Sequence, residues 1–288
     1  MSGSIKAYYQ LTKPGVLYGN VLTAVAGFFL AARGQVDWLL FFAMLIGMTL
    51  VVAAACVLNN YLDYDIDRIM ERTKKRPSVT GEVSRRNILA FAIILAVLGF
   101  AVLTLWTNWL VVIIGAIGYV TYVWLYGVLT KRRSIHGTLV GSIAGAMPIA
   151  GGYVADSGQA DIGLAIVFLI LFFWQFPEFY SIAIYRRKEY AAAKVPVMPV
   201  VKGVHSTIVQ IFLYTILYVV STLSLTFFGY TGIIYLVVMS FIGGYWIWLA
   251  ARGFGTKQPE VWARHMFRFS MITILVLCLM LAIGPLLP

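Results

Sequence analysis

A run of oxygen-bearing side chains follows the second long apolar segment of the chain. Asn59, Asp63 and Asp67 recur there at every fourth residue, so on a helix they share one face, and Asp65 turns to the other side. Acids at this spacing repel one another. A hard cation among the oxygens offsets that repulsion, and carboxylates together with substrate phosphates are the usual ligands of Mg²⁺. We therefore predict that Asn59, Asp63 and Asp67 are catalytic residues that hold Mg²⁺.

A second interpretation of the same segment is a solvated acidic loop. In that case the basic residues that follow would neutralise its charge, and these are Arg68, Arg72 and Arg76. The spacing of the acids by itself leaves both interpretations open.

Another acidic segment follows the sixth apolar run. Glu178, Tyr185 and Glu189 are spaced seven and four residues apart, which is again one helical face. Alone, each of these residues is also compatible with ordinary charge beside a membrane. Two acidic faces among many lysines and arginines describe a site for a diphosphate bridged by metal. The cations would stabilise the charge that develops on a leaving diphosphate.

Histidine and cysteine contribute little to this chemistry. His136, His205 and His265 lack partners at metal-binding spacing, so we interpret them as interfacial residues and not as heme ligands. Cys56 and Cys278 lie in apolar runs, which predicts neither a disulfide nor a metal site.

The composition indicates what must position these residues. Of the 288 residues, 61% are hydrophobic and only 11% are charged, whereas a soluble domain has about 25% charged residues. This excludes a soluble enzyme, a disordered chain and a nucleic-acid-binding module, despite a net charge of +11. We expect one polytopic membrane domain over residues 1–288.

Nine apolar runs are long enough to cross a bilayer, which requires about 20 helical residues. Helices are expected, because a backbone exposed to lipid must satisfy its own hydrogen bonds. The predicted spans are Val16–Ala32, Trp38–Leu58, Ile88–Trp106, Leu110–Gly127, Thr138–Val154, Ile162–Phe176, Thr207–Phe228, Ile233–Ala251 and Phe267–Leu287.

The basic residues predict the orientation of these spans. Every lysine and arginine except Arg33 lies before the first span, in alternate loops or, for Arg268, at the very start of the ninth span. The positive-inside rule then places the N-terminus and both acidic segments in the cytoplasm and the C-terminus outside. The late start of the first span after Lys13 predicts an uncleaved helix. With no Arg/Ser-rich presequence, we expect a bacterial plasma (inner) membrane rather than an organelle.

Several stretches together resemble the UbiA superfamily of intramembrane prenyltransferases. Asn59-x3-Asp63-x3-Asp67-Arg68, with the basic run 71–76, is similar to its first aspartate-rich motif. The resemblance covers nearly the whole chain and is greatest to the branch that farnesylates heme. Further stretches that carry it are Thr12-Lys13-Pro14-Gly15 with Asn20, Lys131-Arg132-Arg133-Ser134, Trp174-Gln175-x-Pro177, Tyr185-x2-Lys188-Glu189-Tyr190, residues 195–203 and Val261-Trp262-Ala263-Arg264.

The resemblance implies nine helices around a central cavity open to the cytoplasmic side. It implies Mg²⁺-dependent transfer of a farnesyl group from farnesyl diphosphate to a vinyl group of heme B, with addition of water, which gives heme O and diphosphate. Glu189 falls where the second motif of the family lies, so the resemblance implies that it is a further metal-binding and catalytic residue. The residues expected to bind substrate are Lys13, Asn20, Arg72, Lys131, Arg132, Glu178, Tyr185, Lys188 and Lys194.

Two positions depart from the pattern of the heme branch. The resemblance leads us to expect histidine where Glu178 stands and aspartate where Glu189 stands. A carboxylate suits Mg²⁺ better than heme iron. We therefore predict that Glu178 acts on the metal side of the site.

Two other functions fit parts of the sequence. The first is prenyl transfer to a quinone precursor or another aromatic acceptor, but Tyr185-x2-Lys188-Glu189 favours heme. The second is a membrane transporter, although transporters place ionisable groups near the midplane rather than at helix ends. The expected partners are farnesyl diphosphate, heme B and membrane lipid, with a downstream heme-modifying enzyme or terminal oxidase as a candidate, and no nucleic acid.

Overall fold

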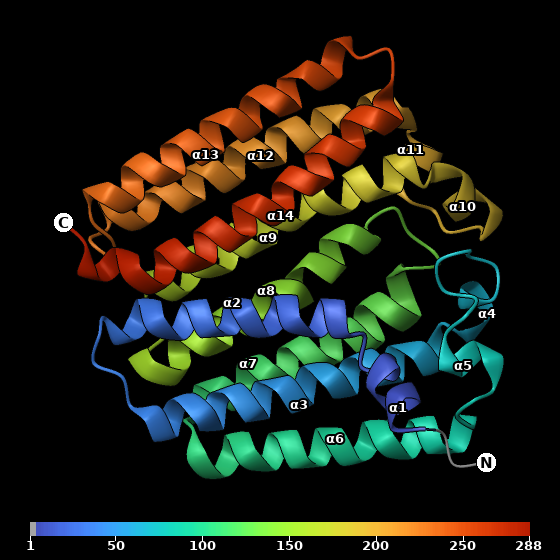
Figure 1. Ribbon diagram of the computed structural model, residues 1–288, viewed down its shortest axis with the longest axis horizontal. Coiled ribbons are helices and arrows are strands. Elements are labelled where there is room, and N and C mark those ends of the chain that lie inside the picture. Colours follow the sequence, from blue (N-terminus) through green and yellow to red (C-terminus); the bar gives the residue numbers. More distant parts are fainter. Residues whose placement is uncertain (1–3) are drawn as a thin grey trace.

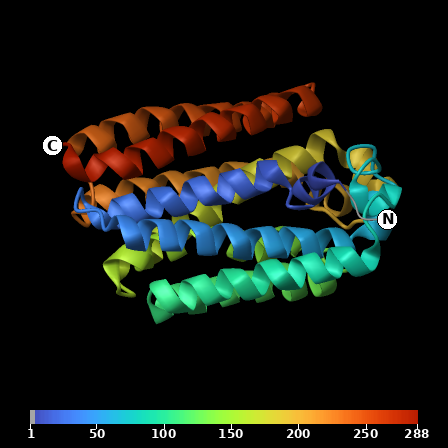
Figure 2. The same ribbon diagram turned by 60° about the horizontal axis from the view of Figure 1, so that its bottom comes forward.

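The computed structural model describes residues 4–288 and contains helices but no β-strands in that range. Nine helical segments are long and apolar enough to cross a membrane, which confirms the predicted number and identifies a multi-pass membrane protein. They lie side by side along the long axis of the molecule (Figure 1, Figure 2). These segments are α2 (Pro14–Ala32), α3 (Trp38–Leu62), α6 (Arg85–Trp106), α7 (Trp109–Val120) continued by η1 (Thr121–Thr130), α8 (Gly137–Ser157), α9 (Ile162–Tyr185), α12 (Gly203–Phe227), α13 (Ile233–Ala251) and α14 (Pro259–Ile283).

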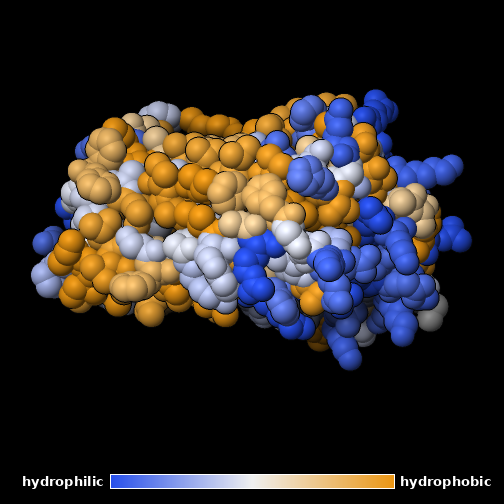
Figure 3. All heavy atoms as spheres, turned by 90° about the horizontal axis from the view of Figure 1, so that it is seen from above, coloured by the Kyte–Doolittle hydropathy of each residue, from blue (hydrophilic) through white to orange (hydrophobic). Residues whose placement is uncertain are grey.

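Short helices gather at one end of the bundle, which we call the charged end. It carries α1 and the loops 63–84, 131–136, 186–202 and 252–258, and the C-terminus lies at the opposite end (Figure 1). Hydrophilic residues are concentrated at this end, and apolar residues cover most of the remaining surface in the same view (Figure 3). The short helices are α1 (Ile5–Leu11), α4 (Tyr64–Asp67), α5 (Pro77–Thr80), α10 (Arg187–Ala192), α11 (Met198–Val201) and η2 (Arg252–Gly255), and η3 (Gly284–Leu286) follows α14.

The contact between α2 and α8 relies on glycine. A Cβ atom on Gly152 would lie 1.9 Å from the carbonyl oxygen of Ala24, and one on Gly27 would lie 2.2 Å from that of Ile149. Small residues allow membrane helices to approach this closely. The contact holds α2, and therefore Lys13 directly before it, at a defined place beside α8.

Two predicted span boundaries are wrong. The sixth span was expected to end at Phe176, but α9 passes through Pro177 and continues to Tyr185. The ninth was expected to begin at Phe267, but α14 begins at Pro259. The apolar runs end where polar residues appear, whereas the helices continue beyond the apolar layer. Proline is tolerated inside membrane helices and favoured in the first helical turn.

Candidate active site

The first acidic segment keeps its helical phase across a helix end. Asp63 ends α3, and α4 follows directly, yet the amide of Asp63 donates to Asn59 O (2.9 Å) and that of Asp67 to Asp63 O (2.8 Å). As a result, Asn59, Asp63 and Asp67 are only 2%, 1% and 3% exposed. The side chain of Asp65 is 64% exposed. The prediction that Asp65 points away from the other three is confirmed.

Three cations from separate elements meet this buried face. Lys13, directly before α2, donates to Oδ1 of Asn59, and Lys131, directly after η1, donates to Asp63. Arg76, directly before α5, donates from Nη1 to Oδ2 of Asp67 at 2.6 Å. Arg76 is absent from the predicted substrate-binding set. Its place in the basic run after Asp67 was the signal that could have identified it.

The three cations also influence one another. Burial lowers the pKa of Lys13 to about 8, and the nearby positive charge of Arg76 adds to this lowering. Burial by itself would raise the pKa of Asp63, but the charges of Lys131 and Lys13 outweigh it and hold that pKa below its ordinary value. Three cations facing two carboxylates leave a net positive charge. The arrangement is therefore suited to an anionic ligand.

The same face has an oxygen free for a metal ion. Oδ1 of Asp63 is buried without a hydrogen bond, and Nη2 of Arg132 lies 3.9 Å from it. A buried acceptor without a partner is costly, so this oxygen favours a ligand. Across residues 4–288 no three His, Cys, Asp or Glu side chains form a metal-binding group. Asp63, Asp67 and Asn59 nevertheless fit Mg²⁺, which is commonly held by one or two carboxylates together with substrate phosphates.

Lys131 is positioned by a π-helix that the sequence did not predict. The second half of the fourth span, η1, is π-helical, and the Lys131 amide donates to Tyr126 O (2.9 Å) five residues earlier. The ammonium group lies 5.6 Å from the centre of the Tyr126 ring. Such segments are rare and often occur at functional sites. Here the π-helix places Lys131 where its ammonium group can donate to Asp63.

Arg132, the other predicted residue of this loop, binds the exposed acid. Its guanidinium group donates to both carboxylate oxygens of Asp65, at 2.5 and 2.7 Å, and to Leu62 O at 2.7 Å. These bonds attach the loop after η1 to the end of α3. Arg132 therefore lies beside the buried face, with Asp65 as its main partner.

The second acidic segment differs from its predicted form. Helix α9 ends at Tyr185, Arg186 has φ −108° and ψ 17°, and α10 begins at Arg187. The prediction of one continuous helical face through Glu189 is therefore wrong. Arg186 leaves the helix and donates to Oε1 of Glu189 at 2.8 Å, while Oε2 of Glu189 is buried without a hydrogen bond. The Tyr185 ring lies between Arg186 and Arg264, 5.7 and 5.3 Å from their guanidinium carbons.

The remaining predicted residues are not gathered at the buried face by direct contacts. Glu178 is half-buried on α9 and forms no hydrogen bond or ion pair within residues 4–288. Asn20 donates to Val16 O at 2.8 Å, within its own helix. Three more are exposed and have no ion pair in the described chain: Arg72, Lys188 and Lys194.

An apolar contact nevertheless places the two acidic segments side by side. Ile66 and Met70, from the first segment, form a buried cluster with Val195, which follows α10. Tyr190 packs against this cluster. The loops after α3 and α9 thus form one unit at the charged end (Figure 1).

Comparison with known proteins agrees with this geometry. The model of the UbiA prenyltransferase family matches residues 20–272. The chain belongs to the UbiA prenyltransferase family. A protoheme IX farnesyltransferase of Yersinia enterocolitica is 46% identical over 279 residues, 97% of this chain and 94% of the relative. One from Photorhabdus laumondii is 44% identical, over 99% of this chain and 97% of the relative.

Solved structures share the fold. A digeranylgeranylglyceryl phosphate synthase has a TM-score of 0.82 at 19% identity, covering 98% of both chains. A UbiA homologue from Archaeoglobus fulgidus bound to GPP and Mg²⁺ has a TM-score of 0.72 at 17% identity, covering 96% of this chain and 99% of the other. The nine-helix architecture of this family member is therefore that of UbiA proteins.

Proposed function

We propose that this UbiA family member transfers a farnesyl group from farnesyl diphosphate to a vinyl group of heme B, which gives heme O and diphosphate after addition of water. Relatives named protoheme IX farnesyltransferase, 44–46% identical over almost the full length, support this acceptor and donor. We place the chain, as a single domain, in the bacterial inner membrane. The basic residues of the charged end support its position in the cytoplasm.

The observation that carries the proposal is the buried face of Asn59, Asp63 and Asp67 with its three cations. The homologue bound to GPP and Mg²⁺ supports a divalent ion beside a prenyl diphosphate here. Asp63, Asp67 and Asn59 would hold it, and Glu189 could add its free oxygen. When bound, Mg²⁺ neutralises charge on the diphosphate.

The cations of this chain have a role of their own. Lys131 and Arg76 pair with the two carboxylates, and Lys13 with Asn59. In our proposal these groups turn from the acidic face to the diphosphate oxygens when the donor binds. Their charge then stabilises the leaving group as the bond between carbon 1 and oxygen of farnesyl diphosphate breaks.

The acceptor half of the reaction requires little from the protein. The electron pair of the broken bond leaves with diphosphate, and the vinyl double bond of heme supplies the electrons of the new carbon–carbon bond. Water then adds to the resulting cation beside the porphyrin ring and loses a proton to solvent. No strong general base is needed, because the vinyl group is itself the nucleophile.

The direct test is an acceptor comparison with purified full-length protein. Farnesyl diphosphate and Mg²⁺ are supplied with heme B or with 4-hydroxybenzoate, and the products are identified by mass spectrometry. We expect heme O from heme B and no sustained prenylation of 4-hydroxybenzoate. Sustained prenylation of 4-hydroxybenzoate, without heme O, would overturn the assignment in favour of a quinone-precursor prenyltransferase.

A further inference from the structure

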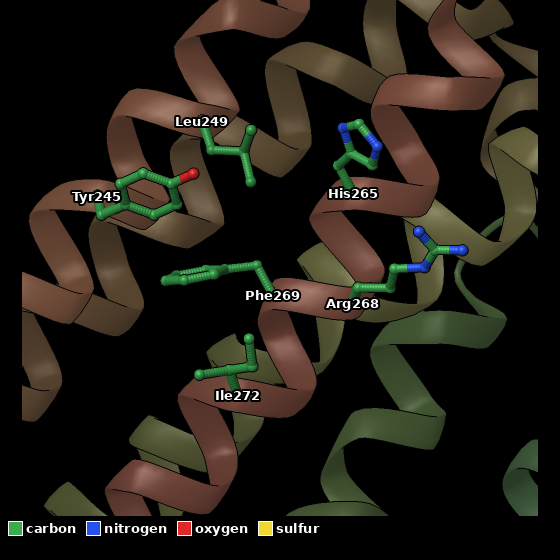
Figure 4. A pocket seen from close by; sticks show the side chains of 6 residues that line it. All are labelled: Tyr245, Leu249, His265, Arg268, Phe269 and Ile272. Carbon is green, nitrogen blue, oxygen red and sulfur yellow. The ribbon is translucent and has the colours of Figure 1, made fainter.

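A groove between α13 and α14 lies apart from the acidic segments. It has a volume of about 200 Å³ (Figure 4). It is formed near the charged end, where the last two membrane helices run antiparallel (Figure 1). Three of its lining residues are apolar and three carry a polar group, and most of the lining surface is apolar. The lining residues are Tyr245, Leu249, His265, Arg268, Phe269 and Ile272.

The polarity of the groove is ordered along α14. His265 and Arg268 come first, nearer the charged end, and Phe269 and Ile272 follow deeper in the bundle. The rise per residue separates His265 from Ile272 by about 10 Å along the helix axis. The hydroxyl of Tyr245 points into the groove from α13 (Figure 4). This order, from charged to apolar with depth, is the order of a phospholipid in a bilayer.

The charge around the groove is positive. Arg268 is exposed and has no ion pair within residues 4–288. The same is true of Arg264 on α14 and of Arg252, the first residue of η2 directly after α13. Glu260, in the first turn of α14, is exposed and forms no ion pair with these arginines in the described chain. Basic pockets between membrane helices on the cytoplasmic side are suited to anionic headgroups.

We propose that this groove binds an anionic phospholipid of the surrounding bilayer. The phosphate lies at His265 and Arg268, and an acyl chain follows Phe269 and Ile272. The rings of Tyr245 and Phe269, with centres 4.7 Å apart, form an aromatic contact between the two helices beside the acyl chain. A soluble phosphate would use only the polar half, whereas a phospholipid uses both halves.

The experiment measures lipid binding to the full-length protein in detergent by native mass spectrometry. Phosphatidylglycerol and phosphatidylcholine are titrated separately onto the wild type and onto Arg268→Gln. We expect the wild type to prefer phosphatidylglycerol, and Arg268→Gln to weaken its binding about fivefold, the effect of one basic residue near a membrane surface. Binding of phosphatidylcholine, in which the choline cation offsets the charge of the phosphate, should weaken less.

Arg86→Gln is the matched control. Arg86 is also exposed at the charged end without an ion pair in the described chain, but it lies on α6, on the other side of the bundle from α13 (Figure 1). It should leave phosphatidylglycerol binding unchanged. Equal losses in both variants, equal affinity of the wild type for both lipids, or displacement of the lipid by millimolar inorganic phosphate would each overturn the proposal.

Discussion

The two acidic segments at the charged end are built in different ways. Asp63 is buried against Lys131, a residue from another span, and Asp67 against Arg76. Glu189, by contrast, pairs only with Arg186, three residues earlier, and Glu178 has no such partner within residues 4–288. Buried ion pairs pay a large desolvation cost and require both partners. The first segment is therefore assembled before any ligand arrives, whereas the second depends on local contacts.

Removing an acid of the first segment should have the largest effect. Asp63→Ala and Asp67→Ala should each lower the rate of heme O formation by at least about 100-fold, the loss seen when one group that stabilises developing charge is removed. Asp65→Ala is the matched control and should be milder, because Asp65 is exposed and bonded to Arg132. Rates are measured with purified protein.

Folding must be checked for these variants, because Asp63→Ala leaves Lys131 without its partner. Asp63→Asn keeps a similar shape and should still be inactive while it elutes as a folded protein in gel filtration. Equal losses at positions 63, 65 and 67 would contradict the distinction between the buried face and the exposed side.

The second-largest effect on catalysis is expected for Lys131, the cation that follows the π-helix η1. Lys131→Gln should raise the KM for farnesyl diphosphate about tenfold, because a hydrogen bond to a charged group is lost. Arg133→Gln, an exposed residue in the same loop without an ion pair in the described chain, is the control. Kinetics at saturating heme B separate the two variants. An unchanged KM in Lys131→Gln would remove this residue from donor binding.

A smaller effect is expected in the second segment. Glu178→Gln should raise the Mg²⁺ concentration needed for half-maximal rate by less than about tenfold. Residues that are bonded to a metal ligand have effects of about 10–100-fold, and Glu178 forms no such bond within residues 4–288. Its effect on heme binding should be slight. Glu178→His is compared in the same Mg²⁺ and heme titrations. A defect confined to heme binding would place Glu178 on the heme side instead.

A carboxylate at the opposite end should affect stability but not activity. Asp161 caps α9 and accepts hydrogen bonds from the hydroxyls of Tyr153 (2.9 Å) and Tyr230 (3.1 Å). Asp161→Ala should lower stability by about 1–3 kcal/mol, as expected for a lost helix cap and charged hydrogen bonds. Thermal unfolding in detergent should show the loss, while the rate of heme O formation stays the same.

The pKa of Asp161 predicts how the stability difference between the wild type and Asp161→Ala changes with pH. Burial by itself would raise the pKa, but the hydrogen bonds from the Leu164 amide and from Tyr153 and Tyr230 outweigh it and hold the pKa below its ordinary value. The stabilisation is therefore present above the ordinary pKa of aspartate and is lost as the pH falls through the lowered one. Wild type and Asp161→Ala should converge in stability at low pH.

The parts of the site set by local periodicity could be predicted from the sequence. The nine spans follow from apolar runs, and the shared face of Asn59, Asp63 and Asp67 follows from a spacing of four that survives the end of α3. The exposure of Asp65 follows from the same spacing. These features depend on residues close in the chain.

Features set by contacts between distant elements could not be predicted in this way. The meeting of Lys131 with Asp63 depends on a π-helix, and no local pattern marks residues 121–130 as π-helical. The break at Arg186 is a local feature, but the spacing of Tyr185 and Glu189 does not mark it. The central cavity and the roles of Lys188 and Lys194 remain predictions.

The most direct measurement compares the hemes extracted from bacteria that lack their own heme-farnesylating activity. The cells carry either the wild-type chain or Asp67→Asn at equal membrane levels, and the extracted hemes are identified by mass spectrometry. We predict that farnesylated heme appears with the wild type and is absent with Asp67→Asn. Farnesylated heme at equal levels in both strains, or in neither, would contradict the claim that the buried acidic face transfers a farnesyl group to heme.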